Sequence, residues 1–257
     1  MYYRLFRDGL FRPVVKWLFR ATVSGQENIP ASGGAILASN HLAAGDTVVL
    51  PSMVSRQVTF PAKAELFKGD RGPGSKAIAW FLKAVGQVPL DRSGGRASLD
   101  GLEPVLEVLA NGGLVGIYPE GTRSPDGRLY KGKTGVARIA LAAGVPVIPV
   151  AMFDTHSVKT RIGIPWIRRP RVVIGRPLDF SPYAGLIGDR TTLRWATDEV
   201  MAAIQALSGQ TYIDAYGSSV KYGSLSQAEA SARELARPGL GATAPELPPA
   251  EKPSANS

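Results

Sequence analysis

The sequence predicts an α/β fold, a single domain with a mixed, mostly parallel sheet flanked by helices. Three observations lead to this prediction. Short apolar runs typical of buried strands alternate along the chain with longer stretches in which apolar residues recur at helical spacing. Glycine and proline separate most of these stretches. The chain has 257 residues, of which 44% are hydrophobic, and this is enough for one large core.

The expected strands are short. The first is the apolar run 35–40, which ends at Asn40. Further strands are expected at 58–62, 88–90, 114–118, 146–150 and 171–175. The clearest helical pattern is 98–110, where leucine and valine fall on one face and two glycines follow. Other helices are expected at 76–84, 134–143 and 191–207.

Two segments lie outside this domain, which is expected to span 22–216. Residues 1–21 mix cationic, apolar and aromatic residues, a pattern typical of an amphipathic helical segment that docks on a membrane, without the apolar run needed to cross one. Pro13 is expected to divide this segment into two short helices. The alternative is a terminal helix packed on the core. The extension 217–257 is expected to be disordered from about residue 237, where proline and small residues predominate.

The charge of the chain restricts its partners. The net charge is +9, which suits nucleic acid, an anionic membrane surface or an acidic substrate. The cationic N-terminal segment favours the membrane, and the sequence contains no recognised nucleic-acid-binding motif. A run of five arginines between Arg161 and Arg176 is expected to meet headgroups or carrier phosphates, or else to be a solvated loop. The chain has no cysteine, which excludes disulfides, thiolate metal sites and cysteine nucleophiles.

His41 directly follows the first expected strand, and open α/β sheets bind their ligands at the carboxyl ends of strands. Asp46 lies five residues later, a spacing that does not place it on the same helical face as the histidine. Gly45 gives the loop the freedom to turn back, so that the carboxylate accepts the ring N–H and stabilises the imidazolium. The alternative is that Asp46 only caps the next helix and His41 is an ordinary loop residue.

A second cluster, Glu120-Gly121-Thr122-Arg123, follows the expected strand 114–118 and is therefore expected at the same edge of the sheet. The planar guanidinium of Arg123 suits a phosphate. Glu120 could hold Arg123 or the loop, and the alternative is a structural Glu–Arg pair in a turn.

Lys63 and Arg92 could add positive charge to the same crevice, and the alternative, the more frequent case for each residue by itself, is a solvated surface charge. Arg92 comes just after the expected strand 88–90.

Four blocks in this order resemble the glycerolipid acyltransferase family, and in particular its PlsC-like 1-acyl-sn-glycerol-3-phosphate (lysophosphatidic acid) acyltransferases. The blocks are Asn40-His41-x4-Asp46, Asp91-Arg92, Pro119-Glu120-Gly121-Thr122-Arg123-Ser124 and Val145 to Val150. The resemblance covers roughly residues 25–215. Two departures from the family pattern are Tyr118, where phenylalanine is frequent, and the less apolar block around Arg92.

The resemblance implies roles for these residues. His41 would be the general base that takes the proton from the acceptor hydroxyl, and Asp46 would orient it. The residues 120–123 would bind the acceptor phosphate. Arg92 matches the arginine of the second block, whereas Lys63 is a looser match. No metal or prosthetic group is implied, and the co-substrate would be acyl-CoA or an acyl-acyl carrier protein.

The expected function is transfer of a fatty acyl group from a thioester to 1-acyl-sn-glycerol 3-phosphate, giving phosphatidic acid in phospholipid biosynthesis. The expected partners are a lysophospholipid acceptor, the acyl donor and an anionic membrane surface, and no nucleic acid. The expected location is the cytoplasmic face of the cell membrane, as a peripheral or monotopic protein. The alternatives are another lysolipid or glycerol 3-phosphate as acceptor and, more remotely, a nonenzymatic membrane-binding module.

Overall fold

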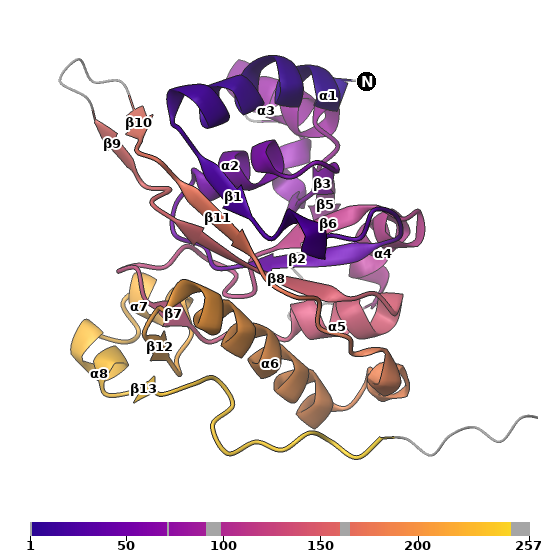
Figure 1. Cartoon of the computed structure of the whole chain (residues 1–257), viewed down its shortest axis with the longest axis vertical. Coiled ribbons are helices and arrows are strands. Elements are labelled where there is room, and N and C mark those ends of the chain that lie inside the picture. Colours follow the sequence, from indigo (N-terminus) through magenta and orange to yellow (C-terminus); the bar gives the residue numbers. More distant parts are fainter. Residues whose placement is uncertain (1, 71, 91–98, 160–164, 248–257) are drawn as a thin grey trace, which may run out of the picture.

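A six-stranded sheet forms the centre of the computed structural model, which describes residues 2–70, 72–90, 99–159 and 165–247 (Figure 1). In spatial order its strands are β1 (Thr22–Ser24), β11 (Arg171–Ile174), β8 (Val147–Phe153), β2 (Ala35–Ser39), β6 (Leu114–Ile117) and β3 (Val58–Thr59). Neighbouring strands run parallel except β11 and β8, which pair antiparallel. The prediction of a mixed, mostly parallel sheet is confirmed.

Strand β2 lies between two parallel neighbours, and all five of its residues are buried. Ile36 pairs with Val115 of β6 on one side and with Val147 of β8 on the other. A strand covered on both faces needs an unbroken apolar run, which is why residues 35–39 do not alternate with polar ones.

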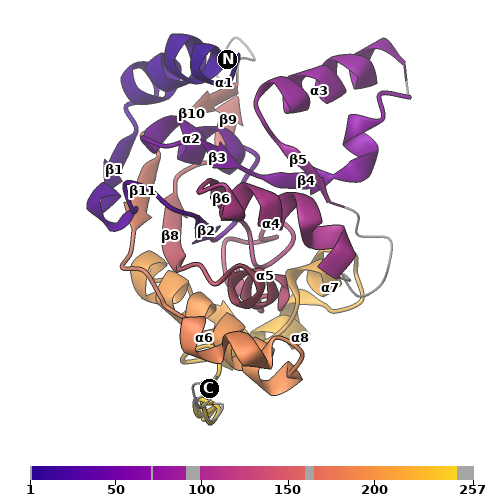
Figure 2. The same cartoon turned by 90° about the vertical axis from the view of Figure 1, so that its right-hand side faces the viewer.

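Helices cover both faces of the sheet, as predicted (Figures 1 and 2). On one face, Ile36 and Ala38 of β2 belong to a core cluster with residues of α4 (Glu103–Ala110), α5 (Gly135–Ala143) and α6 (Arg190–Ser208). On the other face, Leu37 packs with residues of α2 (Asp46–Met53) and of the N-terminal helix. Alternate side chains of one strand therefore serve two separate cores.

The N-terminal segment is one continuous helical stretch over residues 2–18, made of α1 (Tyr2–Phe6) and the π-type stretches Arg7–Phe11 and Val14–Leu18. The prediction that Pro13 divides it is wrong, because Pro13 keeps helical angles (φ −57°, ψ −47°). Pro13 has no N–H to donate, and the helix has wide, π-type turns on both sides of it. One example is the hydrogen bond from the Phe19 N–H to the Val14 carbonyl (2.9 Å).

An arm made of β4 (Pro61–Lys63), α3 (Pro73–Ala84) and β5 (Val88–Leu90) projects beside the sheet (Figure 2). β4 and β5 pair parallel, so the strand expected at 58–62 is in fact two strands that belong to different sheets. A separate pair of strands, β9 (Ser157–Lys159) and β10 (Pro165–Ile167), is antiparallel. Short 3-10 turns occupy Gln26–Asn28, Ala64–Phe67, Leu99–Leu102 and Ser181–Leu186.

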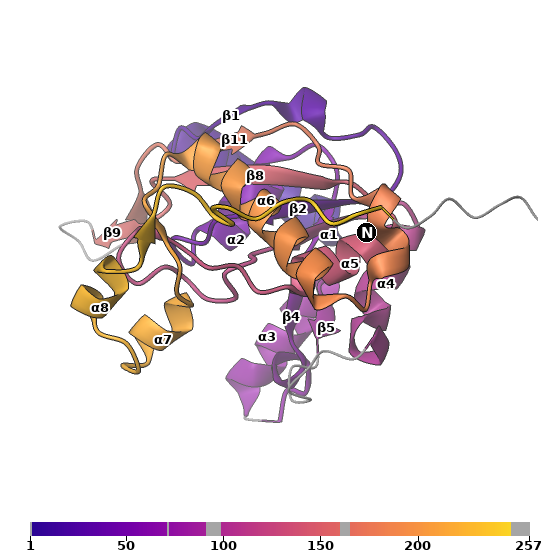
Figure 3. The same cartoon turned by 90° about the horizontal axis from the view of Figure 1, so that it is seen from below.

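The residues after α6 form a small unit at the lower edge of the molecule in Figure 1. In it, β13 (Glu234–Leu235) and β12 (Tyr212–Ile213) form a sheet with the earlier strand β7 (Leu129–Tyr130), and α7 (Gly217–Lys221) and α8 (Gln227–Ser231) complete the unit. Residues 236–247 then run back along α6 (Figure 3), where Arg237 pairs with Glu199 at 2.6 Å. The disorder predicted from about residue 237 stays a prediction, and part of it, 248–257, lies outside the described residues.

Across the described parts of the chain, every helix is too short or too polar to cross a bilayer.

Candidate active site

The loop after β2 carries His41, and two contacts fix where it starts. Asn40 is fully buried. Its amide group accepts a hydrogen bond from the Met152 N–H (2.7 Å) and donates one to the Met152 carbonyl (3.1 Å), as a neighbouring strand residue would. The end of β2 is therefore tied to β8, and His41 leaves the sheet at a defined point.

The imidazole of His41 and the carboxylate of Asp46 are in direct contact, with Nδ1 2.8 Å from Oδ2. The same oxygen accepts hydrogen bonds from the N–H groups of Leu42 (2.7 Å) and Ala43 (2.9 Å). Asp46 is the first residue of α2, and its side chain turns back into the loop instead of capping the helix. The helix-cap alternative is therefore wrong. With the Nδ1 proton directed to the carboxylate, Nε2 carries the lone pair that can accept a proton.

Gly45 is needed in this loop for space. Its φ of −60° is open to any residue, so the predicted role of conformational freedom is wrong. A Cβ at this position would lie 2.4 Å from the Thr155 carbonyl oxygen and 2.8 Å from Ile167 Cδ1. The close approach of the Thr155 segment keeps the His41 loop pressed against the sheet.

The ring of Tyr118 supports the imidazole from one side. The Tyr118 and His41 rings stack with their centroids 3.9 Å apart and an angle of 14° between planes, and Phe60 stacks on Tyr118 at 5.5 Å. Burial, together with the negative charge of Asp46, raises the pKa of the Tyr118 phenol well above its usual value. Among the described residues the Tyr118 hydroxyl has no hydrogen-bond partner.

Glu120 shapes the loop that follows β6. Glu120 is only 1% exposed. Its two carboxylate oxygens accept hydrogen bonds from the His41 N–H (3.1 Å) and the Tyr130 N–H (3.0 Å). Burial raises the pKa of the Glu120 carboxyl to about 8. Within the described ranges Glu120 makes no ion pair with Arg123, so the alternative of a structural Glu–Arg pair is wrong. Glu120 instead links the two motif loops, as does the Ser124 N–H to the His41 carbonyl (2.7 Å).

A cavity of about 610 Å³ opens in front of these loops. His41, Gly121, Thr122 and Arg123 line part of it. The rest of the wall is mainly apolar and comes from the N-terminal helix, α2, α3 and α5, including Phe6, Phe11, Val48, Phe81, Val136 and Ile139. A volume of this size is typical of sites for small-molecule ligands.

The structure thus brings most of the predicted site residues together. His41 and 121–123 lie on the cavity wall, and Asp46 and Glu120 lie behind it. Lys63 is exposed at the end of β4 and does not line the cavity. Arg92 and Arg161 lie outside the described residues, and the remaining four arginines of the 161–176 run are exposed.

Two cavity residues escaped the sequence interpretation. Lys133 and Lys221 line the same cavity as Arg123. Lys133 belongs to a segment with no motif of its own, and Lys221 belongs to the extension that was set apart from the domain. Their places depend on tertiary contacts, and spacing along the chain does not indicate them.

Comparison with known proteins identifies the family of this chain. Residues 20–153, which are 134 of the 257 residues, match the family described as Acyltransferase. The chain is 31% identical over 166 residues to the 1-acyl-sn-glycerol-3-phosphate acyltransferase of Bacillus subtilis, covering 64% of this chain and 76% of that one. It is 32% identical over 166 residues to the chloroplastic 1-acyl-sn-glycerol-3-phosphate acyltransferase LPAT1 of Arabidopsis thaliana, covering 63% of this chain.

The chain spans less than half the length of the chloroplast relatives it matches, 45% of the Arabidopsis protein and 39% of one from Brassica napus. The crystal structure of the 1-acyl-sn-glycerophosphate acyltransferase PlsC from Thermotoga maritima is similar with a TM-score of 0.53 and 25% identity, over 76% of this chain and 78% of that one. Its similarity confirms the α/β fold. By the match over residues 20–153 and the relatives that share it, this chain belongs to the acyltransferase family.

Proposed function

We propose that the protein transfers a fatty acyl group from an acyl thioester to the free hydroxyl of 1-acyl-sn-glycerol 3-phosphate, giving phosphatidic acid for phospholipid biosynthesis. One observation carries the proposal: the His41–Asp46 pair, joined at 2.8 Å, opens on the same cavity as Arg123, and that cavity continues between apolar walls. The names of the bacterial and plant relatives support this choice of acceptor.

The chemistry follows from the position of His41. Nε2 takes the proton of the acceptor hydroxyl while the oxygen attacks the carbonyl carbon of the thioester. The carbon–sulfur bond breaks, and the thiolate leaves with the proton returned by the imidazolium. The products are an ester and a free thiol, so atoms and charge balance. Asp46, which receives two loop N–H groups as well as the ring, steadies the imidazolium charge.

The two substrates are assigned to different parts of the cavity. The apolar walls suit fatty acyl tails, which gain free energy by leaving water. The guanidinium of Arg123 suits a phosphate. The acyl donor is proposed to be acyl-CoA or an acyl-acyl carrier protein, with no resident metal or cofactor.

The N-terminal helix is proposed to dock the protein on the cytoplasmic face of the cell membrane, as a peripheral or monotopic protein. It packs on the core through Val15, while Leu5, Leu10, Trp17 and Leu18 are at least 52% exposed. Trp80 of α3 is also exposed, and its ring contacts Phe6 of the helix, so both elements present apolar groups on this side. Arg4, Lys16 and Arg20 are exposed on the same segment, which suits anionic lipid headgroups.

The test is turnover by the purified chain with 1-acyl-sn-glycerol 3-phosphate in mixed micelles and a panel of acyl-CoA and acyl-carrier-protein donors, with lipid products identified by mass spectrometry. We expect phosphatidic acid from the unaltered protein and loss of activity in His41→Ala by about two to four orders of magnitude. His156→Ala is the matched control, because His156 is the other histidine of the chain and is exposed.

Unfolding curves for both variants check that each is folded. Full activity in folded His41→Ala would overturn the mechanism. Activity on glycerol 3-phosphate or another lysolipid in place of lysophosphatidic acid would overturn the acceptor. Vesicle binding without turnover of any acyl donor would overturn the enzymatic function and support the alternative of a nonenzymatic membrane-binding module.

A further inference from the structure

Lys133 and Lys221 line the cavity that Arg123 and His41 also line. We propose that Lys133, Lys221 and Arg123 together bind the phosphate of the acceptor, and that three cations at one point select a phosphomonoester over a phosphodiester headgroup. The proposal rests on the proposed function and adds to it two binding residues and a basis for acceptor selectivity. One of the two lysines comes from the extension, outside residues 20–153 that match the family.

Lys221 is the last residue of α7, and its ammonium donates a hydrogen bond to the Thr122 hydroxyl at 3.1 Å. The start of α7 lies directly on the same loop. A Cβ added to Gly217 would lie 3.3 Å from the ring of Tyr130 and 3.5 Å from the Thr122 methyl group. This close packing places the C-terminal end of the short helix, and with it Lys221, beside the motif loop.

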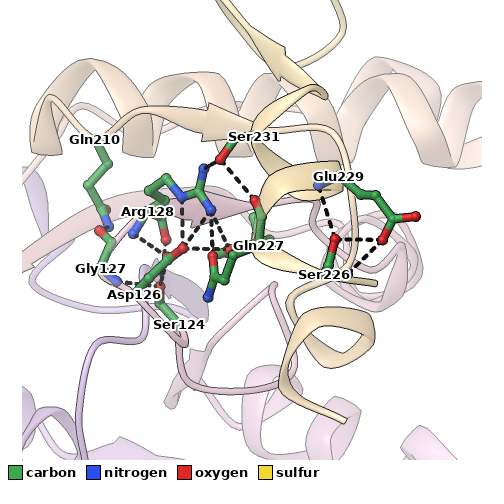
Figure 4. Close-up of polar contacts among 10 residues, drawn as sticks. Ser124, Asp126, Gly127, Arg128, Gln210, Ser226, Gln227, Glu229 and Ser231 are labelled. Carbon is green, nitrogen blue, oxygen red and sulfur yellow. Dashed lines mark hydrogen bonds and ion pairs between the residues drawn. The ribbon is translucent and has the colours of Figure 1, made fainter. Parts of the chain in front are cut away.

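The unit that carries Lys221 is fastened to the segment after the motif. Figure 4 shows Arg128 at the centre of this contact, donating to Ser231 and Gln227 of α8 at 2.8 Å each while it pairs with Asp126. Ser226 and Glu229 close the N-terminus of α8 as a capping box (Figure 4). Backbone pairing adds to this, because β12 lies parallel to β7. The extension is therefore a fixed part of the cavity wall.

Lys133 reaches the site by crossing Gly121. Its backbone N–H donates to the Pro119 carbonyl at 2.8 Å, which sets the two segments side by side. Its Cδ and Cε lie 3.0 Å from where a Cβ of residue 121 would stand. Gly121 also has a positive φ of 71°. Glycine at 121 thus serves both the turn and the path of the lysine.

The three cations lack the carboxylate partners that neighbouring cations have. Lys131 pairs with Asp214 at 2.9 Å and Arg128 with Asp126 at 2.7 Å. Arg123, Lys133 and Lys221 make no ion pair with any described residue, although Glu120 is adjacent in sequence to their loop. Like charges held together raise the energy of the empty site, and a doubly charged anion relieves that repulsion more than a singly charged one.

The position of this cluster points to the acceptor. A phosphate bound there lies in the cavity that His41 also lines, and His41 must reach the acceptor hydroxyl. The acyl tail of the same lipid can extend along the apolar walls. The phosphate groups of an acyl-CoA or of a carrier protein's prosthetic arm offer the same chemistry. The experiment therefore has to separate the two substrates.

The experiment compares Lys133→Met and Lys221→Met with the unaltered chain, with Lys131→Met as matched control. Lys131 lies two residues from Lys133, carries the same charge and does not line the cavity. Steady-state rates give KM for lysophosphatidic acid and, separately, for the acyl donor. Binding of lysophosphatidic acid in detergent micelles without donor is measured by calorimetry, so that affinity is known even where turnover fails. Lysophosphatidylglycerol supplies the phosphodiester comparison.

We expect KM for lysophosphatidic acid and its dissociation constant to rise roughly ten- to hundredfold in each of the two variants, as for loss of one charged hydrogen bond. Donor KM and the behaviour of Lys131→Met are expected to stay within about twofold of the unaltered protein. The ratio of affinities for lysophosphatidic acid and lysophosphatidylglycerol should fall in both methionine variants. In Lys221→Arg, which keeps the charge, this ratio should stay as in the unaltered protein.

Unchanged acceptor affinity in folded variants overturns the proposal. A rise in donor KM alone overturns the assignment to the acceptor. An unaltered protein that binds lysophosphatidic acid through these lysines but does not acylate it would overturn the proposed function and leave the binding site standing.

Discussion

The ring of Tyr118 lies flat against the ring of His41, with centroids 3.9 Å apart. A stacked ring restricts rotation of the imidazole, and the bond to Asp46 fixes its remaining freedom. The tyrosine acts through its ring, because its hydroxyl is buried and has no hydrogen-bond partner in the described parts of the chain. Phenylalanine, frequent at this position in the family the sequence resembles, would supply the same ring.

Tyr118→Phe is therefore expected to keep full turnover and to gain roughly 1 kcal/mol of unfolding free energy, since it removes an unsatisfied buried hydroxyl. Denaturant unfolding and kcat check both parts. Tyr118→Leu keeps an apolar group but loses the stack, and we expect kcat to fall while KM changes little. A large loss of kcat in the phenylalanine variant would show that the hydroxyl has a role the stacking does not explain.

Asp46→Asn tests the carboxylate without removing its shape. Its side-chain oxygen can still accept from Leu42 and Ala43, so the loop should stay folded, but it no longer balances an imidazolium. We expect kcat to fall by about two to four orders of magnitude, with acceptor binding retained. Asp46→Ala should in addition lower stability, because two loop N–H groups lose their acceptor. Equal kcat in the asparagine variant and the unaltered protein would contradict the assigned role.

Glu120 gives stability a dependence on pH. Burial raises its folded-state pKa from an ordinary value of 4.5 to about 8, so the folded chain holds this proton where the unfolded chain has released it. The contribution of this group is fully present below about pH 4.5 and declines as pH rises to about 8, by at most about 1.4 kcal/mol per pH unit. In Glu120→Gln this slope should vanish. Denaturant unfolding at several pH values across this range measures it, and an identical slope in both proteins would refute the prediction.

The exposed apolar face of the N-terminal helix should govern membrane binding. Changing Trp17 and Leu18 to serine removes apolar area without touching the core, and we expect vesicle sedimentation to drop by roughly tenfold or more. Leu240→Ser is the control, since Leu240 is 60% exposed in the C-terminal extension. Binding should strengthen with anionic lipid and weaken with salt. Equal sedimentation of both variants would place the docking surface elsewhere.

Much of the scaffold could be predicted from local pattern. The apolar run 35–40 indicated a buried strand, which the structure has at Ala35–Ser39, and its end correctly placed His41 at the carboxyl edge of the sheet. The loop 120–123 was placed at the same edge because it follows another parallel strand. Both predictions use only the periodicity of one segment and the general geometry of parallel sheets.

Contacts between segments distant in sequence could not be predicted in this way. Glu120 was expected to hold either Arg123 or its loop, and its oxygens accept hydrogen bonds from the N–H groups of His41 and Tyr130. Gly45 was expected to serve conformational freedom, and its reason is the carbonyl of Thr155. Lys221 could not be found at all, since its place depends on the pairing of β12 with β7, more than 80 residues apart.

Because the position of Lys221 depends on that pairing, the parts of the site are completed in a fixed order during synthesis. His41, Asp46 and the two strands that border β2 are all synthesised by Phe153, whereas Lys221 follows β12. A nascent chain stalled before β12 would contain His41 and Asp46 but would lack Lys221, and so part of the proposed phosphate site. The proposed phosphate site is therefore complete only after β12 and α7 have been synthesised.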